Sequence, residues 1–511
     1  MSPTIKKQKS KKGIEFSILV LFLFMAALTV RLYDLKDAPL EFHSTRQLHS
    51  ALMARGIYYA IKDDLSVPDW QRETAIRQWK LEGLIEPPIM EWITAFTYKS
   101  MGAMNLWVAR VYAIGFWILA GIALFLIAEK IIGPIGALVA EGFFLFYPYG
   151  IIASRSFQPE ALLIACLSLY AYAAVNWYGS KTWGWATAVG FLGGLAILIK
   201  TVAIFFILGM WLGLIFSNNS LQQALRNRQL WLAAVLTIIP YGVFHYYGMY
   251  VVGGLASQFS LRFFPQFLTQ SAFYLRWLSS LRKAVGLEWL LISLVGFLLI
   301  KKKSYRWMLF GAWLGYLSLG VTLPHHISTH DYYHLPVYLM VAIGSGAIAA
   351  MISRKILDFT KWGQTFALFI LLFGITIYSY DAYSTLKKVD YYAEEAFWQE
   401  MGTLLGHDAK VIALSEDYGN RLAYWGWLTP TNWMTVDDIQ LRKDAGLDFN
   451  FQTVFDESTA GKDYFLITLF DELERQPELK KLLYSNYQIS KEGKRFVLFD
   501  LRRPLRTGDE P

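Results

Sequence analysis

Long apolar runs separated by short polar breaks dominate the chain up to about residue 380. A run of roughly 18 or more apolar residues can cross a bilayer as a helix. The pattern therefore predicts an all-α polytopic membrane bundle of about eleven spans. They lie near residues 14–31, 106–128, 133–152, 160–177, 184–199, 202–217, 230–252, 286–300, 307–323, 335–352 and 364–380.

Basic residues border these runs on alternate sides. Residues 1–13 hold five lysines and form a basic tail, and Lys301–Arg306 and Ser353–Lys361 fall in loops on the same predicted side. Cytoplasmic loops carry an excess of Lys and Arg, so the pattern predicts a cytoplasmic N-terminus. An odd number of spans then places the C-terminus outside.

Composition excludes some classes of protein. The chain is 55% hydrophobic and has a formal net charge of +8. Because its basic residues flank apolar runs, we assign them to topology and to lipid phosphates, and we expect no nucleic-acid partner. The lone cysteine, Cys166, excludes an intramolecular disulfide.

The predicted first external loop, residues 32–105, carries apolar residues near helical spacing at Thr45–Lys62 and at Pro88–Met101. Tryptophans in and around it suit the water–lipid boundary. We expect two interfacial helices here. A loop that simply packs on the bundle is the alternative.

Composition changes again in the tail, residues 381–511. Short apolar stretches predict strands at Val411–Ser415, Asn432–Val436, Tyr464–Thr468 and Phe496–Leu501, and Asp471–Leu483 reads as a helix. The sequence predicts a small extracytoplasmic α/β domain after a membrane domain at 14–380 that includes the first loop. Neither a P-loop nor a GxGxxG motif is present in the chain.

Ionisable residues gather near the predicted external surface, and charge close to a bilayer is costly and usually functional. By the predicted topology, six groups from distant parts of the chain lie on one face. They are Glu41, His43 and Arg46; Glu86; Arg155 and Glu160; Lys200; Arg262, Arg276, Arg282 and Lys283; and His330, Asp331, Tyr332, Tyr333 and His334.

Such a set suits glycosyl transfer from a polyprenyl phosphate donor. The leaving phosphate develops negative charge, which Arg or Lys would stabilise. The acceptor hydroxyl needs a carboxylate or imidazole base. The lipid tail needs an apolar groove, and aromatic residues make up 16% of the chain.

The layout resembles the GT-C class of glycosyltransferases, in particular the protein O-mannosyltransferase and aminoarabinose transferase family. The resemblance covers roughly residues 14–380. Four stretches carry it, in the family's order: Glu86–Trp92, Arg155–Glu160, Gly194–Lys200 and His330–Pro336. It implies transfer, with inversion at the sugar, on the outer face of a bacterial inner membrane, to a lipid, protein or glycan acceptor.

One departure from the family concerns the base. The family usually carries an Asp-Glu pair in the first loop, and His43 and Ser44 stand at the corresponding positions here. Glu41 and His43 are therefore equal candidates for the catalytic base, and Asp331 is a third.

The remaining polar residues divide by role. Donor-phosphate binding is expected from Arg46, Arg155, Lys200, Arg262 and Arg276, although these could also snorkel or form a solvated face. Substrate binding is expected from Glu86, Glu160, His330, Tyr332 and Tyr333. A divalent cation is a candidate cofactor, but the histidine spacing at 325–334 fits no standard ligand pattern, and we assign no metal ligands.

Two rival classes remain. A membrane transporter or lipid flippase would need polar residues at mid-span, and these are scarce here. A non-catalytic scaffold that presents the tail domain is the third class.

Overall fold

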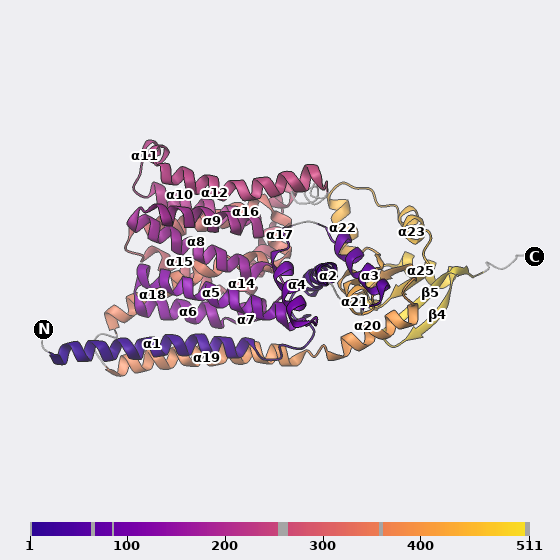
Figure 1. Ribbon diagram of the computed structural model, residues 1–511, viewed down its shortest axis with the longest axis horizontal. Helices are drawn as coiled ribbons and strands as arrows, with labels where there is room; N and C mark the ends of the chain where they lie inside the picture. Colours follow the sequence, from indigo (N-terminus) through magenta and orange to yellow (C-terminus); the bar gives the residue numbers. More distant parts are fainter. Residues whose placement is uncertain (1–2, 63–66, 84–85, 254–263, 357–360, 506–511) are drawn as a thin grey trace, which may run out of the picture. The chain divides into compact units, whose positions relative to one another are not determined.

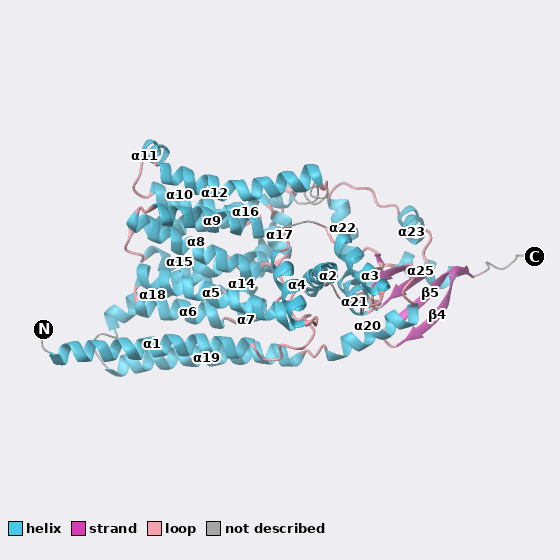
Figure 2. Ribbon diagram, viewed as in Figure 1, coloured by secondary structure: helices cyan, strands magenta, loops and turns pink. Residues whose placement is uncertain are grey.

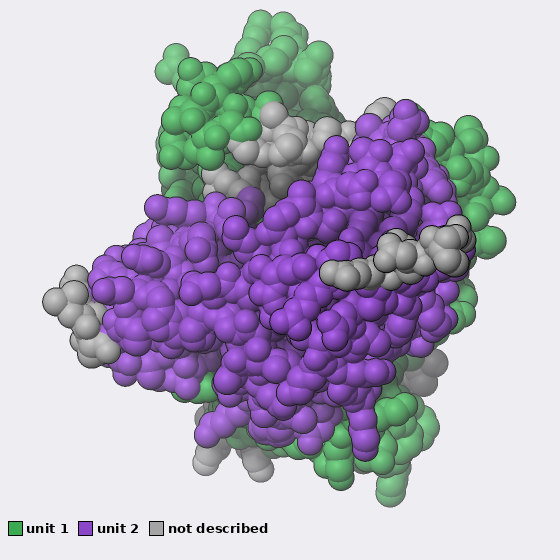
Figure 3. All heavy atoms as spheres, turned by 90° about the vertical axis from the view of Figure 1, so that its right-hand side faces the viewer, with its two compact units in different colours: residues 1–35, 84–89, 107–389 green, residues 36–83, 90–106, 390–511 purple. Residues whose placement is uncertain are grey.

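The computed structural model describes residues 3–62, 67–83, 86–253, 264–356 and 361–505. The chain folds into two compact units, coloured separately in Figure 3. Unit 1 comprises residues 1–35, 84–89 and 107–389, and unit 2 comprises residues 36–83, 90–106 and 390–511. This grouping places most of the first loop with the tail, whereas the sequence-based division kept it with the membrane region.

The described residues of unit 1 form helices joined by turns and loops (Figure 1). Each of the eleven predicted segments coincides with one or two of its helices. In chain order, the elements are α1 (Pro3–Arg31), α5 (Trp107–Ile132), α6 (Pro134–Phe146), α7 (Pro148–Ala153), α8 (Glu160–Ser180), α9 (Trp183–Ile199), α10 (Ala203–Phe216), α11 (Leu221–Arg226), α12 (Arg228–Tyr246), η1 (Tyr247–Val251), η2 (Pro265–Thr269), α14 (Ser271–Val285), α15 (Leu287–Leu298), α16 (Lys303–Thr322), α17 (Pro324–Thr329), η3 (Asp331–His334), α18 (Val337–Ile356) and α19 (Lys361–Lys388).

Six candidate membrane spans are found among the described residues, on α1, α5, α8, α12, α18 and α19. Four shorter apolar helices, α6, α9, α10 and α15, accompany them. The predicted helical membrane bundle is therefore confirmed, while the total of eleven spans stays a prediction.

Glycines allow two of these helices to touch along their backbones. A Cβ atom on Gly311 of α16 would collide with the carbonyl oxygen of Gly209 on α10. A Cβ atom on Gly315 would likewise collide with the carbonyl oxygen of Phe205. Small residues at helix contacts are typical of membrane bundles, where close backbone approach replaces the hydrophobic effect as the source of packing energy.

Unit 2 combines helices with a five-stranded sheet, whose strands are drawn in magenta in Figure 2. Its elements are α2 (Ser44–Ile61), α3 (Asp69–Leu81), α4 (Ile89–Met101), α20 (Tyr392–Leu405), β1 (Val411–Leu414), η5 (Glu416–Gly419), α21 (Asn420–Trp425), β2 (Thr431–Asn432), α22 (Val436–Asp444), α23 (Phe451–Thr459), β3 (Tyr464–Ile467), α24 (Phe470–Glu474), α25 (Pro477–Asn486), β4 (Tyr487–Gly493) and β5 (Phe496–Pro504). The strand order is β2-β1-β3-β5-β4. Strand β1 runs parallel to β2 and β3, and β5 runs antiparallel to β3 and β4.

The predicted helices of the first loop are present as α2 and α4, and their interfacial position stays a prediction. Helix α3 between them was missed. In the tail, Val436 begins a helix instead of ending a strand, because Thr435 and Asp438 form a capping box. Pro477 divides the predicted helix at 471–483 into α24 and α25.

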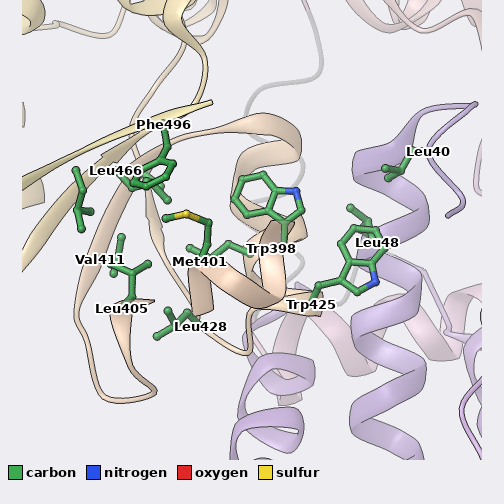
Figure 4. Close-up of a cluster of buried hydrophobic side chains, with 13 residues drawn as sticks. Leu40, Leu48, Trp398, Met401, Leu405, Val411, Trp425, Leu428, Leu466 and Phe496 are labelled. Carbon is green, nitrogen blue, oxygen red and sulfur yellow. The ribbon is translucent and has the colours of Figure 1, made fainter. Parts of the chain in front are cut away.

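One hydrophobic cluster in unit 2 joins segments that are remote in sequence (Figure 4). Leu40 and Leu48 from the first loop share it with Trp398 and Met401 of α20 and with Trp425 of α21. Both leucines are at most 5% exposed. The first loop thus supplies part of the core on which the tail domain folds.

Candidate active site

Lys200 and Glu160 form a buried ion pair in unit 1. The Lys200 Nζ atom lies 2.5 Å from Glu160 Oε1, and the two side chains are 4% and 2% exposed. The chain places them at helix ends: Lys200 follows α9 in extended backbone, and Glu160 is the first residue of α8. Burying a lysine in a membrane bundle costs free energy unless the ammonium group is paired, so the Glu160 carboxylate explains why Lys200 can be buried here.

Two aromatic rings complete the surroundings of this lysine. The ammonium group lies 4.4 Å from the ring centroid of Tyr332 and 4.6 Å from that of Tyr333. Both tyrosines are buried in η3, and their ring centroids are 5.0 Å apart. The structure therefore brings together four of the predicted site residues, which come from three separate stretches of the sequence. We call Glu160, Lys200, Tyr332 and Tyr333 the Lys200 cluster.

Asp331 precedes the two tyrosines and is 6% exposed. It accepts a hydrogen bond of 2.7 Å from the Tyr149 hydroxyl, and its other oxygen lies 2.5 Å from Lys283 Nζ. Lys283 is largely exposed, at 69% of its side chain. Each oxygen of this carboxylate thus has one donor, and an ionised carboxylate keeps further lone pairs that could accept a proton.

Arg155 is buried in the turn between α7 and α8, where its Nη2 atom donates to the Asp34 carbonyl at 3.1 Å. Arg276 is exposed on α14, and Glu86 is half-buried before Pro87. His330 caps η3 at its N-terminus, with its Nδ1 atom 2.7 Å from the Thr329 hydroxyl. Arg262 lies outside the described residues.

The other predicted site residues, Glu41, His43 and Arg46, belong to unit 2. They form a turn that opens α2, in which His43 has the left-handed backbone angles φ 45° and ψ 59°. The His43 carbonyl accepts the amide of Arg46 at 2.9 Å. The His43 ring packs edge to face on Phe42, with 4.6 Å between ring centroids.

Glu41 lies close enough to Tyr391 to affect its ionisation. Burial and then the Glu41 carboxylate raise the pKa of Tyr391 above its usual value. The first-loop turn is therefore bordered by the tail segment that leads into α20.

The tail also supplies three charged residues near this turn. Asp417 accepts hydrogen bonds from the Ser44 hydroxyl and, at 2.9 Å, from the Thr45 hydroxyl. Arg421 lies 2.5 Å from Asp417 and 2.8 Å from Glu394. Sequence reasoning missed Asp417, Arg421 and Glu394 because they come from the tail and follow no recognised motif.

No group of three or more His, Cys, Asp or Glu side chains with metal-binding geometry occurs among the residues that the structure describes.

An apolar cavity of about 500 Å³ opens in unit 1 between α6, α15, α18 and α19. Phe143, Trp289 and Tyr378 contribute aromatic surface to it, and aliphatic side chains of α19 line much of the rest. The Trp289 indole donates to the Tyr378 hydroxyl at 2.7 Å, which joins α15 to α19 beside the cavity. A cavity of this size and character suits a hydrocarbon chain.

Comparison with known proteins supports the predicted resemblance. Residues 85–247 match the model of the dolichyl-phosphate-mannose-protein mannosyltransferase family. A comparison with curated proteins gives no match to this chain.

Solved structures match over most of the chain. The crystal structure of ArnT from Cupriavidus metallidurans bound to undecaprenyl phosphate aligns with a TM-score of 0.58 and 14% identity, covering 96% of this chain and 98% of ArnT. The archaeal oligosaccharyltransferase AglB from Archaeoglobus fulgidus, in complex with an inhibitory peptide and a dolichol-phosphate, aligns with a TM-score of 0.55 and 10% identity, covering 95% of this chain and 74% of AglB. The chain thus has an ArnT-like fold of the GT-C type, and the resemblance inferred from the sequence is confirmed at the level of the fold.

Proposed function

We propose that this chain is a membrane glycosyltransferase that moves a sugar from a polyprenyl-phosphate donor to an acceptor on the extracytoplasmic face of the membrane. The observation that carries the proposal is the Lys200 cluster, a buried cation held at helix ends in a chain with an ArnT-like fold. ArnT has been solved with undecaprenyl phosphate, and AglB with a dolichol-phosphate. Both are phosphate-headed polyprenyl lipids of the class that we assign to this chain.

In the proposed reaction, the acceptor oxygen forms a bond to the anomeric carbon of the sugar. The bond from that carbon to the donor phosphate breaks, and its electron pair leaves with the polyprenyl phosphate. Attack from the face opposite the leaving group inverts the configuration. The acceptor proton passes to a base on the protein.

We assign the binding of the donor phosphate to Lys200 and Arg155 of unit 1. The same role is assigned to Arg46, Arg262 and Arg276. Charge that develops on the leaving phosphate is stabilised by cations already fixed in place. Within the Lys200 cluster, Glu160 and the two tyrosine rings hold the ammonium group in a single position, so its reorganisation during the reaction is small. Glu86 and His330 are assigned to the sugar or the acceptor.

The base is assigned to Glu41 or His43 in unit 2, with Asp331 as the third candidate. A histidine has an ordinary pKa suited to a base near neutral pH.

We assign the polyprenyl tail to the apolar cavity beside α19. The full topology belongs to the same proposal: eleven spans, a cytoplasmic N-terminus, interfacial helices in the first loop and an extracytoplasmic tail domain, in a bacterial inner membrane. A divalent cation remains a candidate cofactor, and a lipid, protein or glycan a candidate acceptor.

The test is consumption of a polyprenyl-phosphate donor carrying a radiolabelled sugar by the purified chain in nanodiscs. We expect Lys200→Met to reduce the rate at least a hundredfold, the loss typical of removing one electrostatic contact to a transition state. Lys491→Met, an exposed lysine on β4, is the matched control and should leave the rate unchanged. A wild-type chain that moves the lipid across the bilayer without consuming the donor would instead be a flippase.

The base is identified with Glu41→Gln, His43→Ala and Asp331→Asn in the same assay. Loss of the base should lower kcat about a hundredfold or more. Glu400→Gln, an exposed carboxylate on α20, serves as the control. If all three variants transfer sugar at near-normal rates, the assignment of the base is wrong.

A further inference from the structure

The turn that opens α2 has an unusual backbone. His43 adopts φ 45°, and no side-chain hydrogen bond from His43 caps the helix. Non-glycine residues rarely occupy this left-handed region, and they persist there when surrounding contacts fix them. The two residues that follow, Ser44 and Thr45, both donate their hydroxyls to one oxygen of Asp417.

The segment that presents Asp417 is unusual in the same way. Asp417 and Tyr418 have φ values of 54° and 55°, and Gly419 follows with φ 77°. Three consecutive left-handed residues turn the chain sharply after β1 and direct the Asp417 carboxylate to the start of α2. The side chain of Asn420 adds a hydrogen bond of 3.3 Å to the Thr45 carbonyl.

A network of charges holds this carboxylate in place. Arg421 bridges Asp417 and Glu394, and Arg495 lies 2.6 Å from Glu394. Burial alone would raise the pKa of Glu394, but hydrogen bonds and charge from Arg421 and Arg495 outweigh it and lower that pKa. Glu394 thus stays ionised near neutral pH, and the Arg421 that it holds binds the Asp417 oxygen that Ser44 and Thr45 do not use.

We infer that Asp417 is a positioning residue that the tail domain contributes to the active site: its carboxylate fixes the Ser44–Thr45 step and thereby sets where His43 and Arg46 point. The inference rests on the proposed function, in which His43 is a candidate base and Arg46 binds phosphate. It gives the tail domain a role in transfer, since the first loop alone does not contain the acceptor of these two hydrogen bonds.

Three variants separate this role from simple support of the fold. Asp417→Ala removes the acceptor, Asp417→Asn keeps an amide oxygen for the hydroxyls but ends the ion pair with Arg421, and the double variant Ser44→Ala/Thr45→Val removes the donors. Asp437→Asn, an exposed carboxylate on α22, is the control.

Kinetics of transfer give the first measurement. We expect Asp417→Ala and Ser44→Ala/Thr45→Val each to lower kcat about tenfold, because small misplacements of catalytic groups have effects of this order or more. Asp417→Asn should stay within about threefold of the wild type, and combining Asp417→Ala with the double variant should cause no further loss. If Asp417→Asn is as impaired as Asp417→Ala while the double variant is normal, Asp417 acts only through its ion pair and the inference is wrong.

Hydrogen exchange gives a second measurement, independent of catalysis. The amides at the start of α2 should exchange about tenfold faster in Asp417→Ala than in the wild type, with the rest of unit 2 unchanged. Unchanged exchange at this turn would overturn the inference alone. A wild-type chain that consumes no donor would overturn the proposed function, and with it the catalytic part of this inference, even where the exchange rates respond as expected.

Discussion

Each of the two units contains a carboxylate paired with a cation at 2.5 Å, but the carboxylate is buried in unit 1 and half-buried in unit 2, and the surroundings of the pairs differ. In unit 1, Lys200 is bordered by Glu160 and two tyrosine faces. In unit 2, Asp417 accepts from Arg421 and from two hydroxyls, and Arg421 is shared with Glu394.

Because of this difference, Lys200 can bind a ligand, whereas Asp417 holds neighbouring parts of the chain together. An ammonium group has three donors, and ring faces are weaker partners than a phosphate oxygen, so a donor phosphate can compete for Lys200. Asp417 is shared among three donors from two parts of the chain. We therefore expect changes to the first pair to affect chemistry and stability together, and changes to the second network to act through geometry.

The largest effect on stability is expected from Lys200→Met. It leaves Glu160 as a buried carboxylate without its cation, and breaking a buried pair in this way typically costs about 3–5 kcal/mol. Thermal unfolding in detergent measures the loss. Adding Glu160→Gln should restore much of the stability but not the activity, and a double variant as unstable as Lys200→Met would contradict the comparison.

A somewhat smaller loss is expected from Arg55→Met in unit 2. The Arg55 guanidinium donates to the carbonyl oxygens of Ala423, at 2.8 Å, and Tyr424, and it lies 4.0 Å from the centroid of the Trp427 ring. Burial lowers its pKa to about 10, so it remains charged at neutral pH. Losing hydrogen bonds from a charged group costs about 2–3 kcal/mol.

Arg55→Lys tests whether the fork of the guanidinium matters, because an ammonium cannot span both carbonyl groups and the ring. Hydrogen exchange of the amides of unit 2 should show Arg55→Lys nearly as destabilised as Arg55→Met. Full stability in Arg55→Lys would mean that charge alone is needed.

A pH-dependent effect of smaller size is expected from Glu394→Gln. The folded-state pKa of Glu394 is lowered, so its stabilising contribution is present above its ordinary pKa of 4.5 and is lost as the pH falls through the folded value. The variant should therefore be less stable than the wild type at pH 7, and the two should converge in strongly acidic solution. Melting temperatures between pH 3 and pH 7, about the range over which a glutamate titrates, measure this. A constant difference across the range would exclude the carboxylate as its source.

The smallest effect is expected from Asp437→Ala. The ion pair of Asp437 with Arg475, at 3.1 Å, lies on the surface, where the two side chains are 85% and 51% exposed. Water and salt screen such pairs, so no resolvable change in melting temperature is expected. A clear shift in melting temperature would show that the burial of an ion pair does not determine how strongly it stabilises the protein.

The hydrophobic pattern predicted most of the helices because each apolar run is long and continuous, as in α5 and α8. It also marked the polar breaks that place Glu160 and Lys200 at helix ends. Strand β4 was not predictable in this way, since six of its seven residues are exposed and it has no apolar alternation. Its position follows from pairing with β5, which local pattern does not reveal.

The residues of the candidate site were likewise predictable only where the local sequence marks them. Sequence singled out Lys200, Tyr332 and His43 because charge and aromatic residues stand out against apolar runs. It did not find Asp417, whose partners Ser44 and Thr45 are more than 370 residues away in the chain. A contact of that separation depends on the tertiary fold, and a lone carboxylate after a strand has no distinguishing local signal.

The shared core of unit 2 has a consequence for synthesis. Leu40 and Leu48 are made early, whereas their partners Trp398 and Trp425 follow only after the intervening residues 107–389 of unit 1. At translation rates of about 5–20 residues per second, the first loop waits roughly 15–60 s for the other half of its core. During that interval its apolar face must be shielded by lipid, by a chaperone or by the insertion machinery.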